Sequence, residues 1–263
     1  MSSASPPAGP PAVLAFAATD PTGGAGLQAD LLTAASLGCH PLSVVTAITV
    51  QDTTGVGELQ PLDAALVERQ ARCVLGETRV GAFKLGVLGS VDNVRAIARV
   101  VADHPKVPLV LDPVLASGRG DPLASETIIA ALLEHLVPRT TIATPNSIEA
   151  RRLGGEKALL SRGCRYVLVT GTHEPGAQVV NTLYGPNGLA RAERWERLPG
   201  EYHGSGCTLA SAIAAFLALG RDVPAAVHEA QDYTWQALAA AFRSGKGQLT
   251  PDRLFRLRET ESK

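Results

Sequence analysis

The sequence predicts an α/β fold with a mostly parallel central sheet, and three observations support this. Short apolar runs alternate along the chain with segments of helical periodicity. The apolar runs are continuous rather than alternating with polar residues, which is typical of strands buried on both faces. Polar and glycine-rich clusters follow most of these runs, and ligands bind at the carboxyl ends of the strands in such sheets. We therefore expect one ligand site along one edge of the sheet.

The first half of the chain predicts three strand–helix pairs. Apolar or β-branched runs predict strands at 12–18, 40–50 and 80–88. Apolar residues at helical spacing predict helices at 26–38, 62–75 and 91–104. Gly38 ends the first of these helices, and Ser90 is the expected N-cap of the third.

The second half continues the pattern and then changes it. Strands are predicted at 107–114, 140–146, 165–171, 177–185 and 189–198. Helices are predicted at 124–138, from 147 onward, at 206–219 and at 224–243. The last three strands follow one another closely, with no helix between them, so they predict an antiparallel edge.

Length and composition favour one domain. The chain has 263 residues, 45% of them hydrophobic, enough for one large core. Its first eleven residues, "MSSASPPAGPP", predict a disordered tail, which leaves 12–263 as a single domain. The formal net charge is −1 with no basic stripe, which argues against nucleic acid or an anionic membrane as partner.

The sequence has no transmembrane segment and no cysteine pattern typical of disulfides or zinc. No apolar run reaches the roughly 20 residues that span a bilayer. The four cysteines have no CxxC spacing, so a disulfide framework or zinc site is not expected. Scattered cysteines of this kind predict a reducing, cytoplasmic compartment.

The segment "HGSGC" at 203–207 combines small residues with the start of a predicted helix. Small residues let the backbone approach a ligand, and the free N–H groups of a helix start attract anions. The segment therefore predicts an anion hole at Gly204, Ser205 and Gly206. The helix dipole is expected to lower the pKa of the Cys207 thiol. A tight turn with a buried cysteine is the structural alternative.

Two carboxylates follow neighbouring predicted strands. Asp112 ends one strand before a proline, and Glu149 lies in the first turn of the helix after "TPN". Together they predict a Mg²⁺ site of the kind that phosphoryl transfer uses. A turn aspartate and a helix-capping glutamate are the structural alternatives.

Gln51 follows a predicted strand directly. Its carboxamide has donors and an acceptor that match the edge of a heteroaromatic ring with an amine and a ring nitrogen. A strand-end residue bonded to a loop is the structural alternative. The sequence leaves the role of Lys84 open, gives His203 no ligand-spaced partner, and favours packing for Trp195 and Trp235.

Seven segments in order resemble the ribokinase-like superfamily, and within it the hydroxymethylpyrimidine/phosphomethylpyrimidine kinases of thiamine biosynthesis. They are "TDPTGGAGLQADL", "VVTAITVQDTTGV", "KLGVLGS", "VLDPVLASGRGD", "TPNSIEA", "VLVTGTHE" and "HGSGCTLASAIAA". The resemblance implies a three-layer α/β/α sandwich and a homodimer. It also implies Mg²⁺- and ATP-dependent phosphorylation of 4-amino-5-hydroxymethyl-2-methylpyrimidine, and then of its monophosphate to the diphosphate.

The resemblance also assigns site residues. It implies catalytic roles for Cys207, Gly204, Ser205 and Gly206, and places substrate at Gln51, Asp30, Ala18, Val87 and Val114. It implies ATP contacts at Asn146, Thr170 and Gly171, and metal ligands at Asp112 and Glu149.

The chain departs from the family pattern in places, and two other functions stay open. Thr170 stands where lysine is frequent, Val87 stands where methionine is frequent, and the span 153–164 is short, so that a covering helix is expected to be missing or truncated. A pyridoxal/pyridoxine kinase of the same fold is the first alternative. A non-catalytic pyrimidine- or nucleotide-binding regulator is the second. The segment 116–122 is the expected lid.

Overall fold

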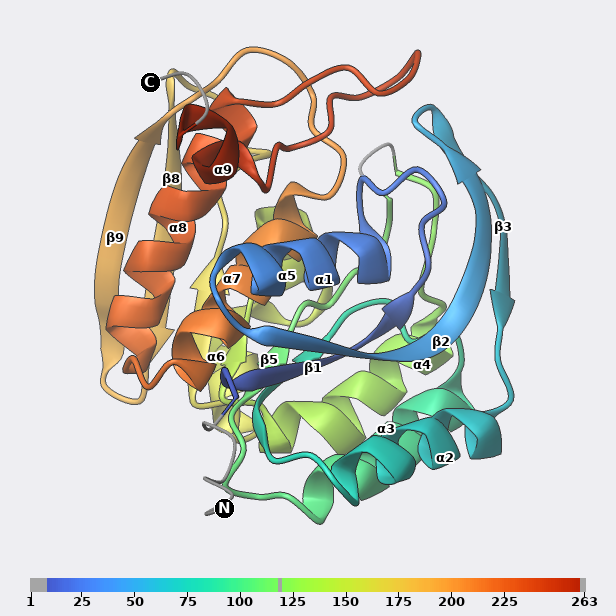
Figure 1. The fold of residues 1–263 in the computed structure, drawn as a ribbon. Helices are drawn as coiled ribbons and strands as arrows, with labels where there is room; N and C mark the ends of the chain where they lie inside the picture. The colour runs from blue at the N-terminus through green and yellow to red at the C-terminus, as the bar shows by residue number, and fades with distance from the viewer. Residues whose placement is uncertain (1–8, 118–119, 261–263) are drawn as a thin grey trace, which may run out of the picture.

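A twisted sheet forms the middle layer of the computed structural model, which describes residues 9–117 and 120–260 (Figure 1). The strand order is β3-β2-β1-β4-β5-β6-β7-β8-β9. The strands are β1 (Ala12–Ala18), β2 (His40–Asp52), β3 (Gly55–Pro61), β4 (Val80–Leu85), β5 (Leu109–Leu111), β6 (Ile142–Ala143), β7 (Tyr166–Val169), β8 (Gln178–Gly185) and β9 (Gly188–Glu196).

Helices cover both faces of the sheet. They are α1 (Gly26–Ser36), α2 (Ala64–Leu75), α3 (Val91–Ala102), α4 (Glu126–Ala131), α5 (Ser147–Arg152), α6 (Gly155–Ser161), α7 (Ser205–Ala218), α8 (Val223–Ala239) and α9 (Phe255–Thr260). A π-helical turn at Leu132–Leu136 and a 3₁₀ turn at Val137–Arg139 continue α4. Among the described residues, no helix is long and apolar enough to cross a bilayer.

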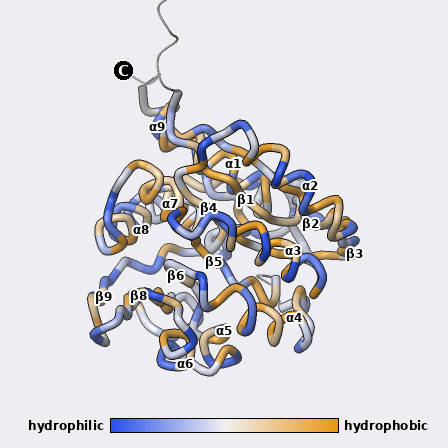
Figure 2. The backbone as a smooth tube through the Cα atoms, turned by 90° about the horizontal axis from the view of Figure 1, so that it is seen from below, coloured by the Kyte–Doolittle hydropathy of each residue, from blue (hydrophilic) through white to orange (hydrophobic). Residues whose placement is uncertain are grey.

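The pairing of the strands confirms the predicted fold class. The strands from β2 through β1, β4, β5 and β6 to β7 are parallel to their neighbours. The pairs β7–β8 and β8–β9 are antiparallel, as the closely spaced strands predicted. The pair β2–β3 is antiparallel as well, so both margins of the sheet contain antiparallel pairs. Figure 2 shows these margins, β2–β3 and β8–β9, at opposite sides of the molecule.

Each face of the sheet has its own apolar core, because successive side chains of a strand point to opposite faces. Leu14 and Phe16 of β1 pack with residues of α2, α3, α4 and α6. Val13, which precedes Leu14 and points to the opposite face, packs with residues of α7 and α8. The result is the three-layer α/β/α arrangement.

The structure differs from the sequence prediction in several elements. Strand β3 was missed because its sequence, "GVGELQP", has two glycines and a proline, and it becomes a strand only by pairing with β2. The predicted helix 124–138 was wrong as a continuous α-helix, because the π turn and Pro138 end the α-helical hydrogen bonding. The strand predicted at 140–146 is reduced to two residues because Pro145 and the N-cap Asn146 begin a helix.

Other expectations fall on short or undescribed segments. The short span 153–164 contains the seven-residue helix α6, so a covering helix is present there in shortened form. The predicted disordered tail at 1–11 lies mostly outside the described residues, which begin at 9. Residues 118–119 of the expected lid lie outside them too.

Candidate active site

A cleft with a volume of about 550 Å³ lies at the carboxyl ends of the strands. Its walls come from the loops after β1, β4, β5, β6, β7 and β9, from strands β2 and β3, and from the start of α7. All the residues that the sequence assigned to a site line this cleft, except Asp30 and Gly171. Residues from six loops thus meet at the edge where a doubly covered sheet binds its ligands.

The start of α7 is built on a glycine in the left-handed region. Gly204 has φ +83, and a Cβ on it would lie 2.0 Å from the carbonyl oxygen of Gly24. Glycine is therefore the residue that both the backbone and the space admit at this position. The first-turn amides of an α-helix have no partner within the helix, and those of Ser205, Gly206 and Cys207 belong to residues that line the cleft. This is the geometry of an anion hole.

The thiol of Cys207 does not behave as the helix dipole alone predicted. The side chain is half-buried, and burial raises the pKa of the thiol to about 12. Lys84 acts to lower this pKa, whereas Asp112 and Asp30 act to raise it. Burial together with two carboxylates outweighs the dipole, so the expectation of a lowered thiol pKa was wrong.

Lys84 is the residue whose role the sequence left open, and it lies at the centre of the charges beneath the cleft. Its side chain is 1% exposed, with Nζ 2.8 Å from Oδ1 of Asp30 and 3.8 Å from Oδ2 of Asp112. Ser211 of α7 donates to the same Asp30 oxygen at 2.7 Å. Asp30, expected at the substrate, therefore lies under the cleft as the counter-charge of Lys84. A lysine inside an apolar strand was the signal in the sequence.

Asp112 and Glu149 form an acidic pair that fits a divalent cation. Burial raises the pKa of Asp112 to about 6, with Lys84 opposing this effect and Asp30 adding to it. Burial, reinforced by the charge of Asp112, raises the pKa of Glu149 to about 7. Oδ2 of Asp112 is buried without a hydrogen-bond partner. Two mutually repelling carboxylates with a spare oxygen suit Mg²⁺.

Glu149 also caps the start of α5, which is the structural alternative that the sequence left open for it. Asn146 and Glu149 form a capping box, in which the Asn146 side chain accepts from the Glu149 N–H at 2.9 Å and Oε2 of Glu149 accepts from the Asn146 N–H at 2.9 Å. Oε1 of Glu149 accepts from the Leu115 N–H at 3.1 Å. These bonds hold the carboxylate in place, where the charge of Asp112 acts on it. Among the described residues, no cluster of three or more His, Cys, Asp or Glu could hold a metal.

The loop after β7 lines one end of the cleft, the end away from β2. Thr170 bridges to Asn146 and lines the cleft, with its carbonyl accepting from the Ser147 N–H at 3.0 Å. Gly171 lies behind the wall, where its N–H donates to Oδ1 of Asn181 at 3.0 Å. A Cβ on Gly171 would lie 2.3 Å from the carbonyl oxygen of Val180, so the loop requires glycine there.

The opposite end of the cleft is lined by Gln51, Ala18, Val87 and Val114. A register shift between Val50 and Gln51 interrupts the β2–β3 ladder. Gln51 also acts on Asp20, because its side chain helps to lower the pKa of that carboxyl. One amide, three small apolar residues and the neighbouring acid suit a small, flat, polar-edged ring.

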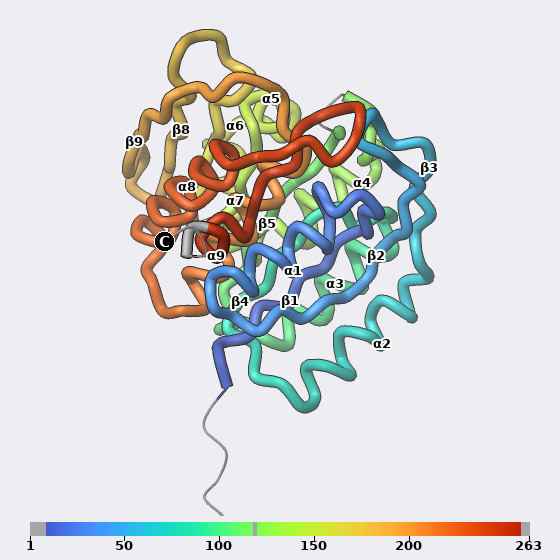
Figure 3. The backbone as a smooth tube through the Cα atoms, turned by 45° about the horizontal axis from the view of Figure 1, so that its top comes forward, coloured from blue at the N-terminus to red at the C-terminus, as the bar shows by residue number. Residues whose placement is uncertain are grey.

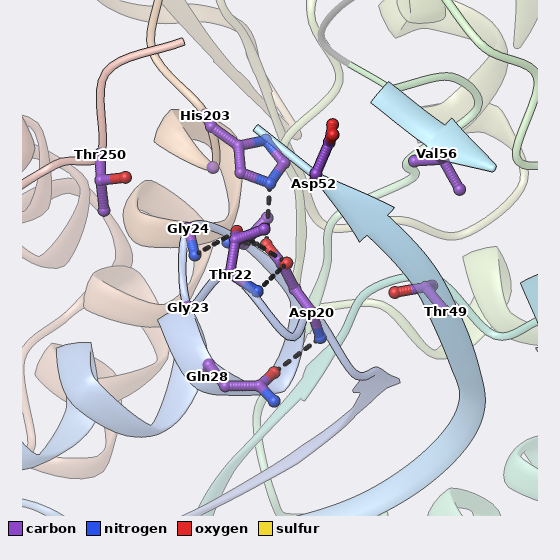
Figure 4. A network of polar contacts seen from close by, with 12 residues as sticks. Asp20, Thr22, Gly23, Gly24, Gln28, Thr49, Asp52, Val56, His203 and Thr250 are labelled. Carbon is purple, nitrogen blue, oxygen red and sulfur yellow. Dashed lines mark hydrogen bonds and ion pairs between the residues drawn. The ribbon is translucent and has the colours of Figure 1, made fainter. Parts of the chain in front are cut away.

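Asp20 and His203 lie beside the Gln51 end of the cleft, and the sequence did not point to either of them. Nε2 of His203 lies 2.7 Å from Oδ2 of Asp20, and Figure 4 shows the two side chains pointing at each other across the glycine loop. Asp20 also accepts from the N–H and hydroxyl of Thr22, both at 2.8 Å, and from the N–H of Ala25 at 2.6 Å. No spacing in the sequence relates two residues that lie 183 positions apart.

Trp195 and Trp235 line the cleft, and their indole N–H groups are engaged in hydrogen bonds. Trp195 donates to Gln231 and Trp235 to the carbonyl of Glu196, each at 3.0 Å. Gln231 also accepts from Asn181 at 2.9 Å. The indoles are thus fixed in the wall, consistent with the packing role that the sequence favoured.

Comparison with known proteins shows which family this chain is similar to. The family model described as phosphomethylpyrimidine kinase matches residues 20–252. A hydroxymethylpyrimidine/phosphomethylpyrimidine kinase of Streptomyces coelicolor is 38% identical over 263 residues, covering 94% of this chain and 96% of that protein.

Solved structures show the same fold. The ADP complex of Bacillus subtilis pyridoxal kinase superposes with a TM-score of 0.87 at 27% identity, covering 94% of this chain and 99% of that one. The phosphomethylpyrimidine kinase of Clostridium difficile superposes with a TM-score of 0.76 at 32% identity, covering 87% and 99%.

Proposed function

The chain belongs to the phosphomethylpyrimidine kinase family, and on that premise we propose a pair of reactions for it. It transfers the γ-phosphoryl group of ATP to the hydroxyl of 4-amino-5-hydroxymethyl-2-methylpyrimidine, and then transfers a second to the monophosphate. The observation that carries this proposal is the cleft itself. Gln51, the acidic pair Asp112–Glu149 and the segment Gly204–Cys207 all line it.

The substrate ring occupies the end of the cleft at Gln51. The Gln51 carboxamide pairs with the amine and the neighbouring ring nitrogen of the pyrimidine. Ala18, Val87 and Val114 offer apolar contact to the faces of the ring, and the cleft that they line excludes water from it. The hydroxymethyl group then points toward Cys207.

The thiol of Cys207 orients the acceptor hydroxyl. Its sulfur accepts the hydrogen bond of the hydroxyl and leaves an oxygen lone pair directed at phosphorus. Its own S–H faces Asp112, which the thiol helps to keep ionised. Phosphoryl transfer passes through a loose transition state, so positioning contributes more than a strong base. As the oxygen–phosphorus bond forms and the bond to ADP breaks, the hydroxyl proton passes to sulfur while the S–H proton passes to the Asp112 carboxylate. No phosphoryl group becomes attached to sulfur.

The amides of Ser205, Gly206 and Cys207 bind the oxygens of the transferring phosphoryl group. Asp112 and Glu149 would hold Mg²⁺, and the bound ion would neutralise charge on the phosphate oxygens. Asn146 and Thr170 lie beside Glu149 and are the proposed nucleotide contacts. Thr170 is neutral where lysine is frequent, so this chain relies on the metal and the anion hole for charge.

A pyridoxal kinase activity is the second candidate, and one observation favours it. The fold is closer to the Bacillus subtilis pyridoxal kinase, with a TM-score of 0.87, than to the Clostridium difficile phosphomethylpyrimidine kinase, with 0.76. Sequence identity is instead higher with the phosphomethylpyrimidine kinase, at 32%, than with the pyridoxal kinase, at 27%. Gln51 favours the aminopyrimidine, because its amide complements an amine beside a ring nitrogen.

A side-by-side assay tests the proposal. ADP release is followed with hydroxymethylpyrimidine, its monophosphate and pyridoxal, each at matched concentrations. We expect the highest kcat/KM with hydroxymethylpyrimidine, and turnover of the monophosphate. A higher kcat/KM with pyridoxal would reassign the enzyme to the second candidate.

We also infer a cytoplasmic enzyme that works as a homodimer. The four cysteines are all free, which supports a reducing compartment. The homodimer follows from the family resemblance and is tested by light scattering of the purified protein. A monomer mass of 27.3 kDa in solution would reject it.

A further inference from the structure

Arg253 is a buried arginine that the proposed reaction does not yet use. It lies in the segment between α8 and α9, where Thr250, Pro251, Asp252 and Arg253 are all buried although they form no helix. The Tyr233 hydroxyl donates to the carbonyl of Arg253 at 2.8 Å and anchors it from α8. The side chain is 3% exposed. Arg253 lies one position beyond the residues that the family model matches.

The guanidinium group joins the glycine loop to the start of α7. Nε donates to the hydroxyl of Thr208 at 3.0 Å, Nη1 donates to the carbonyl of Gly23 at 3.3 Å, and Nη2 donates to the carbonyl of Gly24. Thr208 in turn donates to the carbonyl of Gly204 at 2.8 Å. Figures 1 and 3 show the segment before α9 passing close to α1 and α7.

All three acceptors of Arg253 are neutral. Among residues 9–117 and 120–260, no carboxylate oxygen lies within 4.0 Å of the guanidinium as an ion-pair partner. The titratable groups that face it are Cys207, Tyr233, Asp30 and Asp20. Asp30 is paired with Lys84 and Asp20 with His203, while the adjacent Asp252 is paired with Arg258.

A buried cation without an adjacent anion is costly, and arginine cannot escape the cost by losing its proton. An apolar side chain of similar size would fill the same space more cheaply. The buried positive charge of Arg253 therefore calls for a functional explanation. It lies directly behind the loop and helix start that form the anion hole.

We propose that Arg253 is a positioning residue for the phosphate of the substrate, and that its buried charge favours a phosphate monoester in the anion hole at Gly204–Cys207. It touches no ligand itself, because Gly23, Gly24 and Thr208 occupy its donors. It acts through them, by holding the glycine loop against α7 and by placing its charge behind the amides. This inference rests on the proposed function.

Two substitutions separate charge from packing. Arg253→Gln keeps N–H donors for the carbonyls and removes the charge. Arg253→Lys keeps the charge and loses the planar fork. Calorimetry then measures the affinity of each variant for hydroxymethylpyrimidine and for its monophosphate, which differ only by the phosphate.

Arg253→Gln is expected to weaken binding of the monophosphate by about tenfold and of the unphosphorylated pyrimidine by less than about threefold. Arg253→Lys is expected to keep both affinities within about threefold of the unsubstituted protein. Equal losses for the two ligands in Arg253→Gln would show a packing role only and overturn the proposal. Unchanged binding of the monophosphate would overturn it as well.

A measurement on the unsubstituted chain covers the case in which the variants do not fold. Arg253 is the one arginine that is buried within the described residues, so its Nε–Hε NMR signal is protected from exchange. Added inorganic phosphate is expected to shift that signal, and an unshifted signal at saturating phosphate would reject the role. If the protein binds neither pyrimidine, the proposed substrate is wrong, and this phosphate experiment still tests Arg253.

Discussion

Nε2 of His203 lies 2.7 Å from Oδ2 of Asp20, and this contact joins the loop after β1 to the loop before α7. Gly24 lies under the imidazole so closely that a Cβ would be 2.2 Å from Cδ2 of His203. The proposed ring end of the cleft and the proposed anion hole are therefore joined by one contact. A change at Asp20 should reach both.

Asp20→Asn should destabilise the fold at neutral pH. Burial acts to raise the pKa of Asp20, but hydrogen bonds from His203, Gln51 and Thr22 outweigh it and hold this pKa well below the ordinary value. We expect a loss of roughly 1.5–3 kcal/mol in the free energy of unfolding by urea at pH 7. Because the folded-state pKa is lowered, this stabilisation is present above about pH 4 and disappears as the pH falls toward the folded value.

Asp103→Asn is the surface control for that experiment, since its side chain is 56% exposed and pairs with the exposed Arg72. It should change the free energy of unfolding by less than about 1 kcal/mol at pH 7. Equal stability of Asp20→Asn and the unsubstituted protein at pH 7 would contradict the role given to Asp20.

Gly204→Ala should be far more damaging than Gly206→Ala. The first places a Cβ at φ +83 and 2.0 Å from the Gly24 carbonyl, whereas the second finds Asp112 Oδ1 as its nearest neighbour, at 3.9 Å. We expect Gly204→Ala to lose at least about 2 kcal/mol of stability. The melting temperature of Gly206→Ala should stay close to that of the unsubstituted protein. Similar losses in both variants would show that the left-handed turn is not required.

The sequence located the site because its residues follow strands, and strand ends of a parallel sheet share one edge. Gln51, Asp112, Glu149 and Cys207 could be assigned to one cleft on that ground, with the resemblance adding their roles. Their exact partners could not be assigned. Arg253 and Gly24 lie 229 positions apart in the chain, and such contacts have no period or spacing.

The pKa values and ion pairs of side chains were predicted less well from the sequence where they depend on burial. The helix start at Cys207 was visible in the sequence, but the burial that raises its thiol pKa was not. Lys84 stood in an apolar strand, and only the fold shows Asp30 and Asp112 beside it. Strand β3 depended on its pairing with β2, which outweighed the low strand propensity of glycine and proline.

Lys84→Met should destabilise the protein strongly. It leaves Asp30, which is 2% exposed, without its cation, and removes the charge that faces Asp112. Breaking a buried pair in this way typically costs about 3–5 kcal/mol, so we expect a loss of that size in urea unfolding. Adding Asp30→Asn should restore part of the loss, because it removes the stranded charge.

The control for Lys84 is Arg221→Met, which breaks a surface pair whose side chains are 53% and 35% exposed. It should cost less than about 1 kcal/mol. A Lys84→Met variant as stable as Arg221→Met would mean that the buried pair contributes nothing.

Cys207→Ala should lose most turnover while it keeps its nucleotide. In the proposed mechanism the thiol orients the acceptor hydroxyl, and loss of one such contact typically lowers kcat by roughly 10²–10³-fold. ATP affinity, measured by calorimetry, should stay unchanged because the proposed nucleotide contacts are Asn146 and Thr170. Cys207→Ser is the matched variant and should keep more activity than alanine, because a hydroxyl also accepts a hydrogen bond. Near-normal turnover in Cys207→Ala would remove the residue from the mechanism.

Mg²⁺ affinity should rise with pH between about 6 and 7. Burial and mutual repulsion raise the pKa of Asp112 to about 6 and of Glu149 to about 7, so below these values each carboxyl holds a proton that a cation must displace. Calorimetric titration with MgCl₂ should therefore give weaker binding and more proton release at pH 6 than at pH 8. Glu149→Gln removes the group that titrates at higher pH, and its Mg²⁺ affinity should be lower and less dependent on pH above 7. An affinity that is equal at pH 6 and pH 8 in the unsubstituted protein would place the metal elsewhere.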